Sequence, residues 1–326
     1  MRIIVNEKLD GKMLREFLRR DMGVSTALLK HLKFTDGGIL VNGKRENVRY
    51  MLCRGDVLDL LLEDNEEDVS PYVHPVDLPL DVVFEDEYLT VVNKPFDMPA
   101  HPSLGHPDDT VANALAYRYR DKTYVFRPVN RLDRNTSGLM LTANTRIAAY
   151  HASLAMRAGE IRKVYVAVLD GIPEQLSGIR KSRIRRRAGS IIEREETSDE
   201  TSGKEAITVY TTIAAGENTA VVLASPLTGR THQLRLHFAG MGCPITGDDL
   251  YGHASEEIGR QALHAAHLRL PHPEDGRILS LTSRLPDDIK EVIRARFPER
   301  AEEIIRRAEA CSFDDLKKEV PIPDET

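Results

Sequence analysis

The sequence predicts an α+β protein in which a mixed central β-sheet is flanked by helices and preceded by a small α/β module. Three observations lead to this fold class. The 326 residues are enough for two domains of roughly 150 residues each. An acidic segment that contains prolines divides the chain after residue 62. Downstream of it, strand-like and helix-like stretches are intermixed.

The composition is that of a globular chain. Hydrophobic residues make up 41% and charged residues 29%, and charges interrupt every apolar stretch before it reaches the roughly 18 residues of a membrane span. The first residues lack the apolar core and cleavage site of a secretory signal. Cys53, Cys243 and Cys311 lie too far apart for a disulfide framework or paired zinc ligands. We therefore expect a cytoplasmic monomer with no membrane partner.

Residues 1–62 form the first predicted unit. Apolar residues at helical spacing predict two short helices around a break at 23–25, and Asn42-Gly43 marks a tight turn between short strands. The unit is mildly basic, since residues 1–60 hold 12 Lys and Arg against 8 Asp and Glu although the whole chain has a net charge of −6. Four of its cations are candidates for contacts to phosphates: Lys30, Lys33, Lys44 and Arg45. The alternative is that they are ordinary exposed side chains.

Residues 63–79 are expected to be a linker. The run from Glu63 to Asp68 is almost entirely acidic and is followed by Pro71, Pro75 and Pro79. Such a segment has little apolar surface with which to offset the entropy cost of ordering. We therefore expect the first unit to move relative to the rest of the chain until a binding partner holds it.

Residues 80–285 mix strands with helices. Strands are predicted at 80–84, 89–92, 164–169, 207–212 and 220–223, and helices at 110–119, 146–157 and 231–239. Residues 286–326 form a charged helical extension whose last residues, 321–326, are expected to fray. The apolar stripe of this extension consists of Ile289, Val292, Ile293, Ile304 and Ile305.

The most informative segment runs from Arg127 to Leu141. It places one carboxylate, Asp133, between Arg131 and Arg134 and ahead of an apolar run that should be buried. Neighbouring cations keep an aspartate ionised at neutral pH, which is the state that a nucleophile or a general base requires. A surface aspartate that caps a turn or pairs with an arginine is the alternative that this segment leaves open.

A second dense segment runs from Pro226 to Gly252. If Thr231 caps a helix, Arg235 lies one turn further on and points a cation back at Asp133. His232 and His237 invite a metal site, but they are five residues apart rather than four and no glutamate lies between them. We expect packed or hydrogen-bonding histidines here and no metal.

Together the two segments resemble the RluA-type pseudouridine synthases of RNA. Residues 131–139 match the R-L-D-x-x-T-S-G-L segment of that family, and residues 229–237 match its G-R-T-H-Q-L/I-R-x-H segment. Shorter matches follow in family order across residues 80–275. Residues 12–60 are similar to the small S-four type RNA-binding module that often precedes this catalytic domain.

The resemblance implies the pseudouridine synthase catalytic fold and the isomerisation of uridine in RNA. In this reaction the base is detached from its ribose at N1, rotated and rejoined through C5, with no cofactor. By the family pattern Asp133 is the catalytic carboxylate, Tyr165 lies against the target base and helps to remove the C5 proton, and Arg235 pairs with Asp133. Three arginines are candidates for contacts to the phosphates that flank the target: Arg131, Arg134 and Arg230. The alternative is that they are ordinary solvated arginines.

Two features depart from this pattern or are not explained by it. Asn130 stands where the family commonly has His, and Asn does not titrate near neutral pH. The run from Arg180 to Arg187 holds six cations in eight positions and is expected to be a loop inserted between two strands. Contact with RNA phosphates and exposure to water are equally open for this run.

The sequence thus predicts a pseudouridine synthase that acts on structured RNA, with large-subunit ribosomal RNA as the favoured substrate. A transfer-RNA substrate is one alternative. A catalytically silent RNA-binding or ribosome-assembly factor is another, against which the intact set of Asp133, Tyr165 and Arg235 speaks. A carboxylate-dependent glycosidase is disfavoured, because neither dense segment supplies the usual second carboxylate.

Overall fold

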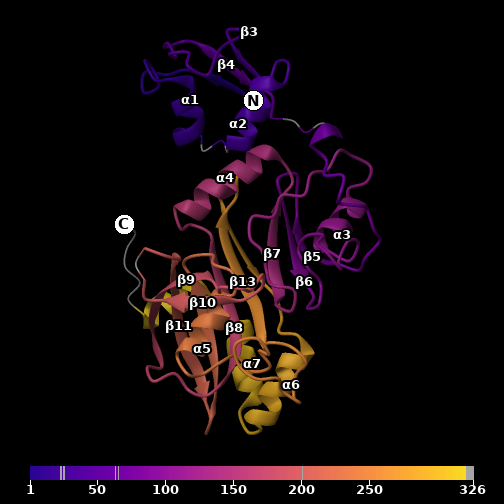
Figure 1. Cartoon of the computed structure of the whole chain (residues 1–326), viewed down its shortest axis with the longest axis vertical. Helices are drawn as coiled ribbons and strands as arrows, with labels where there is room; N and C mark the ends of the chain where they lie inside the picture. Colours follow the sequence, from indigo (N-terminus) through magenta and orange to yellow (C-terminus); the bar gives the residue numbers. More distant parts are fainter. Residues whose placement is uncertain (23, 25, 63, 65, 200, 321–326) are drawn as a thin grey trace.

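A computed structural model describes residues 1–22, 24, 26–62, 64, 66–199 and 201–320. It contains a four-stranded sheet near the amino terminus and a ten-stranded sheet in the body of the molecule. The small sheet and its helices form one end of an elongated shape (Figure 1). The expected fraying of 321–326, two residues of the predicted helix break and two of the predicted linker lie outside the described residues.

The amino-terminal unit packs its helices against an antiparallel sheet in the order β1-β4-β2-β3. Its core consists of apolar side chains that are almost completely buried, among them Leu14, Leu18, Leu52 and Leu58. Asn42 and Gly43 both have positive φ, as the predicted tight turn requires. The elements are β1 (Arg2–Ile4), α1 (Leu14–Glu16), a π-helical turn (Phe17–Asp21), α2 (Thr26–Phe34), β2 (Ile39–Val41), β3 (Lys44–Arg45) and β4 (Val57–Leu60).

The acidic segment after residue 62 binds to the body of the protein. Arg146 is 6% exposed and donates to Asp64 over 2.7 Å, and it also forms an ion pair with Asp68. Asp68 in turn lies 3.6 Å from the ring of His31 in the first unit. The acidic sequence by itself predicted a linker, because it does not show that a buried arginine, 82 residues after Asp64, is the partner of these carboxylates.

The large sheet is mixed, as predicted, because β7 and β13 run parallel while the other paired strands are antiparallel. All five predicted strands are present. Sheet order is β10 (Arg194–Thr197), β9 (Ser177–Arg186), β11 (Lys204–Ala215), β12 (Thr219–Pro226), β8 (Arg162–Asp170), β13 (Leu263–Pro271), β7 (Ser137–Ala143), β6 (Leu89–Lys94) and β5 (Asp81–Glu85), with β14 (Ile278–Thr282) on β13.

Helices cover this sheet and close its core. Thr110 and Thr145 cap the first two helices of the body through their side chains. The predicted apolar stripe of the carboxy-terminal extension is confirmed, since all five of its isoleucines and valines are at most 4% exposed. The helices are α3 (Val111–Arg118), α4 (Arg146–Arg157), α5 (Gln233–Gly240), α6 (Asp287–Arg296), α7 (Ala301–Glu309) and α8 (Phe313–Glu319).

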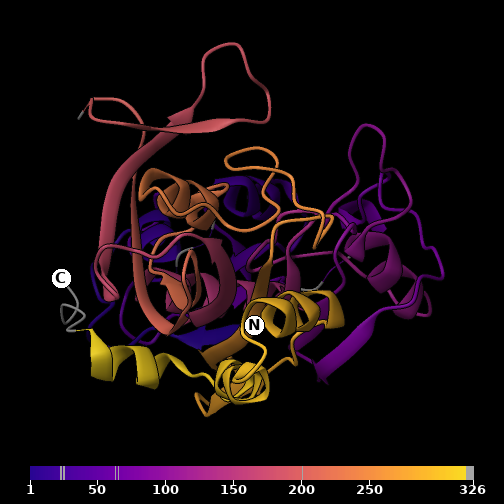
Figure 2. The same cartoon turned by 90° about the horizontal axis from the view of Figure 1, so that it is seen from below.

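The arginine-rich run is not a loop, contrary to the sequence prediction. Most of it lies on β9, which pairs with β10 on one side and β11 on the other. This arm projects from the body (Figure 2). Glutamates of β10 and the preceding turn pair with the arginines, at 2.7 Å for Arg180–Glu196 and for Arg185–Glu195. These cross-strand pairs offset the repulsion between like charges and allow a cationic sequence to form a strand.

Candidate active site

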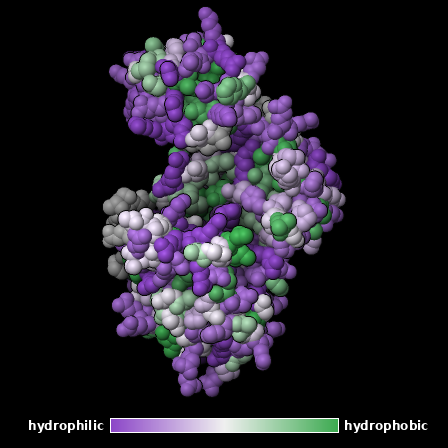
Figure 3. Space-filling view, in the orientation of Figure 1, coloured by the Kyte–Doolittle hydropathy of each residue, from purple (hydrophilic) through white to green (hydrophobic). Residues whose placement is uncertain are grey.

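Asp133 lies in a cavity of about 820 Å³ in the body of the protein. The cavity is lined by the loop 128–136, the start of β8, the preceding turn and residues 226–235. Asp133 is the only acidic residue among the described lining residues, against seven arginines and lysines. On the face shown in Figure 3 the surface is hollowed below the amino-terminal unit and bordered by hydrophilic residues. The positive charge around the cavity favours an anionic substrate.

A buried lysine supports the loop that carries Asp133. Lys94 ends β6, is completely buried and donates to the backbone oxygens of Pro95, Met98 and Arg134, each at 2.8 Å. Burial lowers the pKa of Lys94 to about 7, although the charge of Asp133 opposes this shift. Because one of its three acceptors directly follows Asp133 in the chain, Lys94 fixes the position of the loop that carries Asp133.

The loop leads into β7 through a glycine that the packing requires. Gly138 has a φ of +111°, and a Cβ atom there would lie 2.3 Å from the backbone oxygen of Ala265. This contact is at the parallel pairing of β7 with β13. Gly138 thus lets the two strands approach so closely that the loop before β7 is held over the cavity.

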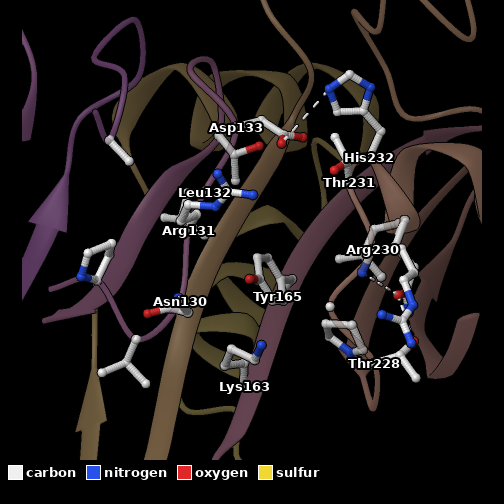
Figure 4. Close-up of a pocket in the computed structure, with 18 of the residues that line it drawn as sticks. Asn130, Arg131, Leu132, Asp133, Lys163, Tyr165, Thr228, Arg230, Thr231 and His232 are labelled. Atoms are coloured by element: carbon white, nitrogen blue, oxygen red, sulfur yellow. Dashed lines mark hydrogen bonds and ion pairs between the residues drawn. The ribbon is translucent and has the colours of Figure 1, made fainter. Parts of the chain in front are cut away.

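A histidine and an arginine face the Asp133 carboxylate at a distance. His232 Nε2 lies 3.9 Å from one carboxylate oxygen (Figure 4). Arg235 Nη1 lies 4.0 Å from the other. The Asp133 side chain is 29% exposed and makes no direct hydrogen bond within the described part of the chain. The electrostatic potential of its neighbours therefore stabilises the Asp133 carboxylate, which remains open toward the cavity.

Arg235 forms the predicted ion pair with Asp133, at 4.0 Å, but a second carboxylate holds it more closely. Arg235 donates from Nε and Nη2 to the two carboxylate oxygens of Asp248, both at 2.7 Å, and its guanidinium lies over the ring of Tyr251. Burial disfavours the Arg235 charge, but the hydrogen bonds and charge of Asp248 raise its pKa. A carboxylate that accepts two hydrogen bonds satisfies the planar guanidinium better than a single contact does. Only the remaining nitrogen, Nη1, therefore faces Asp133.

The expectation that Thr231 caps a helix is wrong. Helix α5 begins at Gln233, and its N-cap is His232, in a left-handed conformation with φ 58° and with no side-chain cap. The ring Nδ1 of His232 is instead 2.8 Å from the hydroxyl of Tyr251, and burial lowers its pKa despite the charge of Asp133. A non-glycine residue at positive φ is unusual, and here the conformation turns the ring toward Asp133.

Tyr165 lies on β8 and is 7% exposed. Burial, with a smaller contribution from the charge of Asp133, raises the pKa of its hydroxyl far above the ordinary value. The hydroxyl lines the cavity and has no hydrogen-bond partner among the described residues. The phenol is thus neutral at physiological pH, and its oxygen is available to a bound molecule.

Asn130 binds backbone rather than a titrating group. Its amide oxygen accepts from the backbone N–H of Leu141 at 2.7 Å, and its amide nitrogen lies 3.5 Å from the oxygen of Leu139. The side chain is 8% exposed. Asn130 therefore fastens the loop that carries Asp133 to β7, a role that requires no protonation change.

The seven predicted RNA-binding residues fall into two groups. Arg131, Arg134 and Arg230 line the cavity with Asp133. Arg134 is also held by Asp97 at 3.2 Å, and Arg230 donates to the backbone oxygen of Glu205 at 2.8 Å. The second group is exposed on the amino-terminal unit, away from the cavity lining, and consists of Lys30, Lys33, Lys44 and Arg45.

Several site residues were not singled out from the sequence. Asp248 was noticed only within a short matched block, and His232 was expected merely to pack or form hydrogen bonds. Lys94 has a visible signal, because a lysine that closes the apolar stretch Leu89–Val92 at the end of a strand must find buried acceptors. No cluster of three or more His, Cys, Asp or Glu suited to a metal occurs in the described ranges.

The comparisons with known proteins agree with this site. A family model described as RNA pseudouridylate synthase matches residues 88–240. YjbO of Bacillus subtilis, described as an uncharacterized RNA pseudouridine synthase, is 38% identical over 277 residues, which cover 84% of this chain and 96% of the relative. The chain belongs to the RNA pseudouridylate synthase family.

Further relatives of this pseudouridine synthase agree. Ribosomal large subunit pseudouridine synthase D of Zymomonas mobilis is 37% identical over 82% of this chain and 88% of the relative. The structure of human RNA pseudouridylate synthase domain containing 1 superposes with a TM-score of 0.54 at 27% identity, covering 65% of this chain and 86% of that one. The protein is thus an isomerase whose substrate is RNA. In the described residues, no helix is long and apolar enough to cross a membrane.

Proposed function

We propose that this synthase isomerises specific uridines in structured RNA through the carboxylate of Asp133, and that its substrate is large-subunit ribosomal RNA. The observation that carries the catalytic assignment is that Asp133 is the only carboxylate among the described residues of a cavity that seven arginines and lysines also line. The buried Tyr165 and the fixed cation of Arg235 stand beside it.

The reaction exchanges one bond to the sugar for another. The bond between C1′ and N1 of the uracil breaks, a bond between C1′ and C5 forms, C5 loses its proton and N1 gains one. Asp133 supplies the negative charge that meets the electron-poor sugar or base, while Arg235 and His232 keep that carboxylate oriented. The neutral Tyr165 hydroxyl, which has no hydrogen-bond partner among the described residues, acts as a relay: it passes its own proton on toward N1 as it takes the one from C5.

The target base must leave its stack to reach this carboxylate. Unstacking costs a few kcal/mol, which contacts to the protein offset. The ring of Tyr165 provides a stacking surface. Arg131, Arg134 and Arg230 are placed to bind phosphates around the extruded nucleotide. On the amino-terminal unit, Lys30, Lys33, Lys44 and Arg45 provide a second set of exposed cations for structured RNA.

The choice of large-subunit ribosomal RNA rests on the relatives. Proteins named ribosomal large subunit pseudouridine synthase D from several bacteria match at 32% to 37% identity. A transfer-RNA substrate is the competing assignment, since the same chemistry serves both classes of RNA.

Site-resolved pseudouridine mapping of total RNA tests the proposal. Cells that lack the gene are compared with cells complemented by the wild type or by Asp133→Asn. We expect one or a few sites in large-subunit ribosomal RNA to disappear and to return only with the wild type. Loss of sites in transfer RNA alone would move the substrate to that class, and restoration by Asp133→Asn would refute the catalytic assignment.

A further inference from the structure

A lysine in the cavity has no partner among the residues that the structure describes. Lys163 lies on β8, two residues before Tyr165, so both side chains leave the strand on the same face. Figure 4 shows the two side chains in the same space. Lys163 is 9% exposed and lines the cavity. Among the described residues its ammonium forms neither a hydrogen bond nor an ion pair.

Most of the Lys163 side chain is buried, and its ammonium meets the outside only through the cavity. A partly desolvated charge without a partner is costly, so its position indicates a partner that enters the cavity from outside. The other buried lysine, Lys94, differs because three backbone oxygens accept from it. Asp133 is not the partner of Lys163, because its carboxylate faces His232 and Arg235 instead. Burial alone lowers the pKa of Lys163, with no carboxylate close enough to oppose the shift.

The missing partner should carry a full negative charge. A carbonyl oxygen of uracil would leave the ammonium charge uncompensated in a poorly hydrated site, whereas a phosphate oxygen forms a charge-assisted hydrogen bond. The cavity volume of about 820 Å³ is at the upper end of the range for small-molecule sites, which leaves room for more than a base. Arg157, exposed at the end of α4, lines the same cavity and donates only to its own helix.

We propose that Lys163 binds a backbone phosphate adjacent to the target uridine, so that the cavity takes the nucleotide together with its phosphate. The inference rests on the proposed function and adds a substrate contact to it. Helix α4 packs against the amino-terminal unit through Ile147 and Tyr150. The RNA strand therefore leaves the cavity past Lys163 and Arg157 in the direction of that unit.

The test compares Lys163→Met with a matched control, Lys318→Met. Lys318 is 75% exposed on α8 and pairs only with Asp315 of the same helix. Both changes are made in the full chain with and without Asp133→Asn, which allows binding to be measured without turnover. The probe is large-subunit ribosomal RNA from cells that lack the gene. Thermal unfolding, RNA affinity at several salt concentrations and pseudouridine formation are measured.

We expect Lys163→Met to unfold at the same temperature as the wild type or higher, because an unpaired charge has been removed from the interior. Its RNA affinity should fall at least tenfold. The slope of log affinity against log salt should become shallower by about 0.7, the value for one phosphate contact in a single strand. Lys163→Arg should restore part of the affinity, and Lys318→Met should change none of these quantities.

Three results would overturn the inference. Affinity within twofold of the wild type would show that Lys163 does not touch RNA. Weaker binding with an unchanged salt slope would assign the contact to a neutral base atom. A large fall in unfolding temperature, shared by Lys163→Gln, would assign a structural role. The proposed function is judged separately, by whether the wild type forms pseudouridine in this RNA and Asp133→Asn does not.

Discussion

At the scale of single residues, the carboxylate that we propose to be catalytic, Asp133, is surrounded by groups whose closest hydrogen bonds go to other partners. Arg235 is held by Asp248, and His232 is held by Tyr251. Both therefore keep their places whether or not a substrate is bound. Asp133 has the guanidinium of Arg235 and the ring of His232 at 4.0 and 3.9 Å, and neither forms a direct hydrogen bond to it. Such preorganised charge costs no rearrangement when the reaction occurs.

Replacing Asp133 with Asn removes the charge and keeps the shape. We expect pseudouridine formation to fall by at least about 1,000-fold while RNA affinity stays within about threefold. Release of tritium from uridine labelled at C5 measures the first quantity and filter binding the second. Asp287→Asn is the control, because the Asp287 side chain is 93% exposed on α6. Turnover within tenfold of the wild type would contradict the role given to Asp133.

Tyr165→Phe removes only the hydroxyl. Because that hydroxyl has no partner in the described part of the protein, its loss should leave stability and RNA binding nearly unchanged. Product formation under single-turnover conditions should slow by roughly 10- to 100-fold, since a proton carrier is missing. A wild-type rate would assign Tyr165 to stacking alone.

At the scale of elements, the site depends on how β7 meets β13. These strands come from opposite ends of the catalytic unit, and their parallel pairing brings the loop before β7 over β8. Gly138 is the residue that permits this approach. Asn130 and Lys94 then fasten the loop to β7 and β6 through backbone oxygens and N–H groups.

Gly138→Ala should therefore disrupt the site as well as the fold. The added Cβ would meet the backbone oxygen of Ala265 at 2.3 Å at a φ that side chains rarely adopt. We expect a loss of about 3 kcal/mol or more in the free energy of unfolding. Gly259→Ala is the control, because no atom lies within 4 Å of its Cβ position. Urea titrations of both variants give the comparison, and equal midpoints would show that β7 adjusts freely.

At the scale of the whole molecule, buried histidines link its stability to pH. Burial lowers the pKa of His237 to about 4 and that of His264 to about 3. His237 joins α5 to the β9–β11 arm through Ser182 and Thr208, with Glu196 and Arg180 beside it. Protonation of either histidine is thus opposed by the folded state.

The sign follows from proton binding. Between pH 6.5 and pH 4 the unfolded chain binds a proton at His237 that the folded chain does not, so acid favours unfolding. This histidine alone should lower the free energy of unfolding by up to about 3 kcal/mol as the pH falls through that window. His237→Gln keeps a hydrogen-bonding side chain and should flatten the profile. Unfolding midpoints at pH 7, 5.5 and 4.5 test this, and an unchanged slope in the variant would rule it out.

The sequence alone determined the reaction class, the mixture of strands and helices in the body and the apolar stripe of α6 and α7. It also named Asp133 and Tyr165 as candidate site residues. These depend on local patterns, such as periodicity and short motifs, that are legible without knowing what packs against them. Only the tertiary structure decided that Asp248 holds Arg235 more closely than Asp133 does, that Arg146 receives the acidic segment and that the arginine run forms β9. Each of these outcomes is a competition among charged groups far apart in the chain, and geometry and burial select the partner.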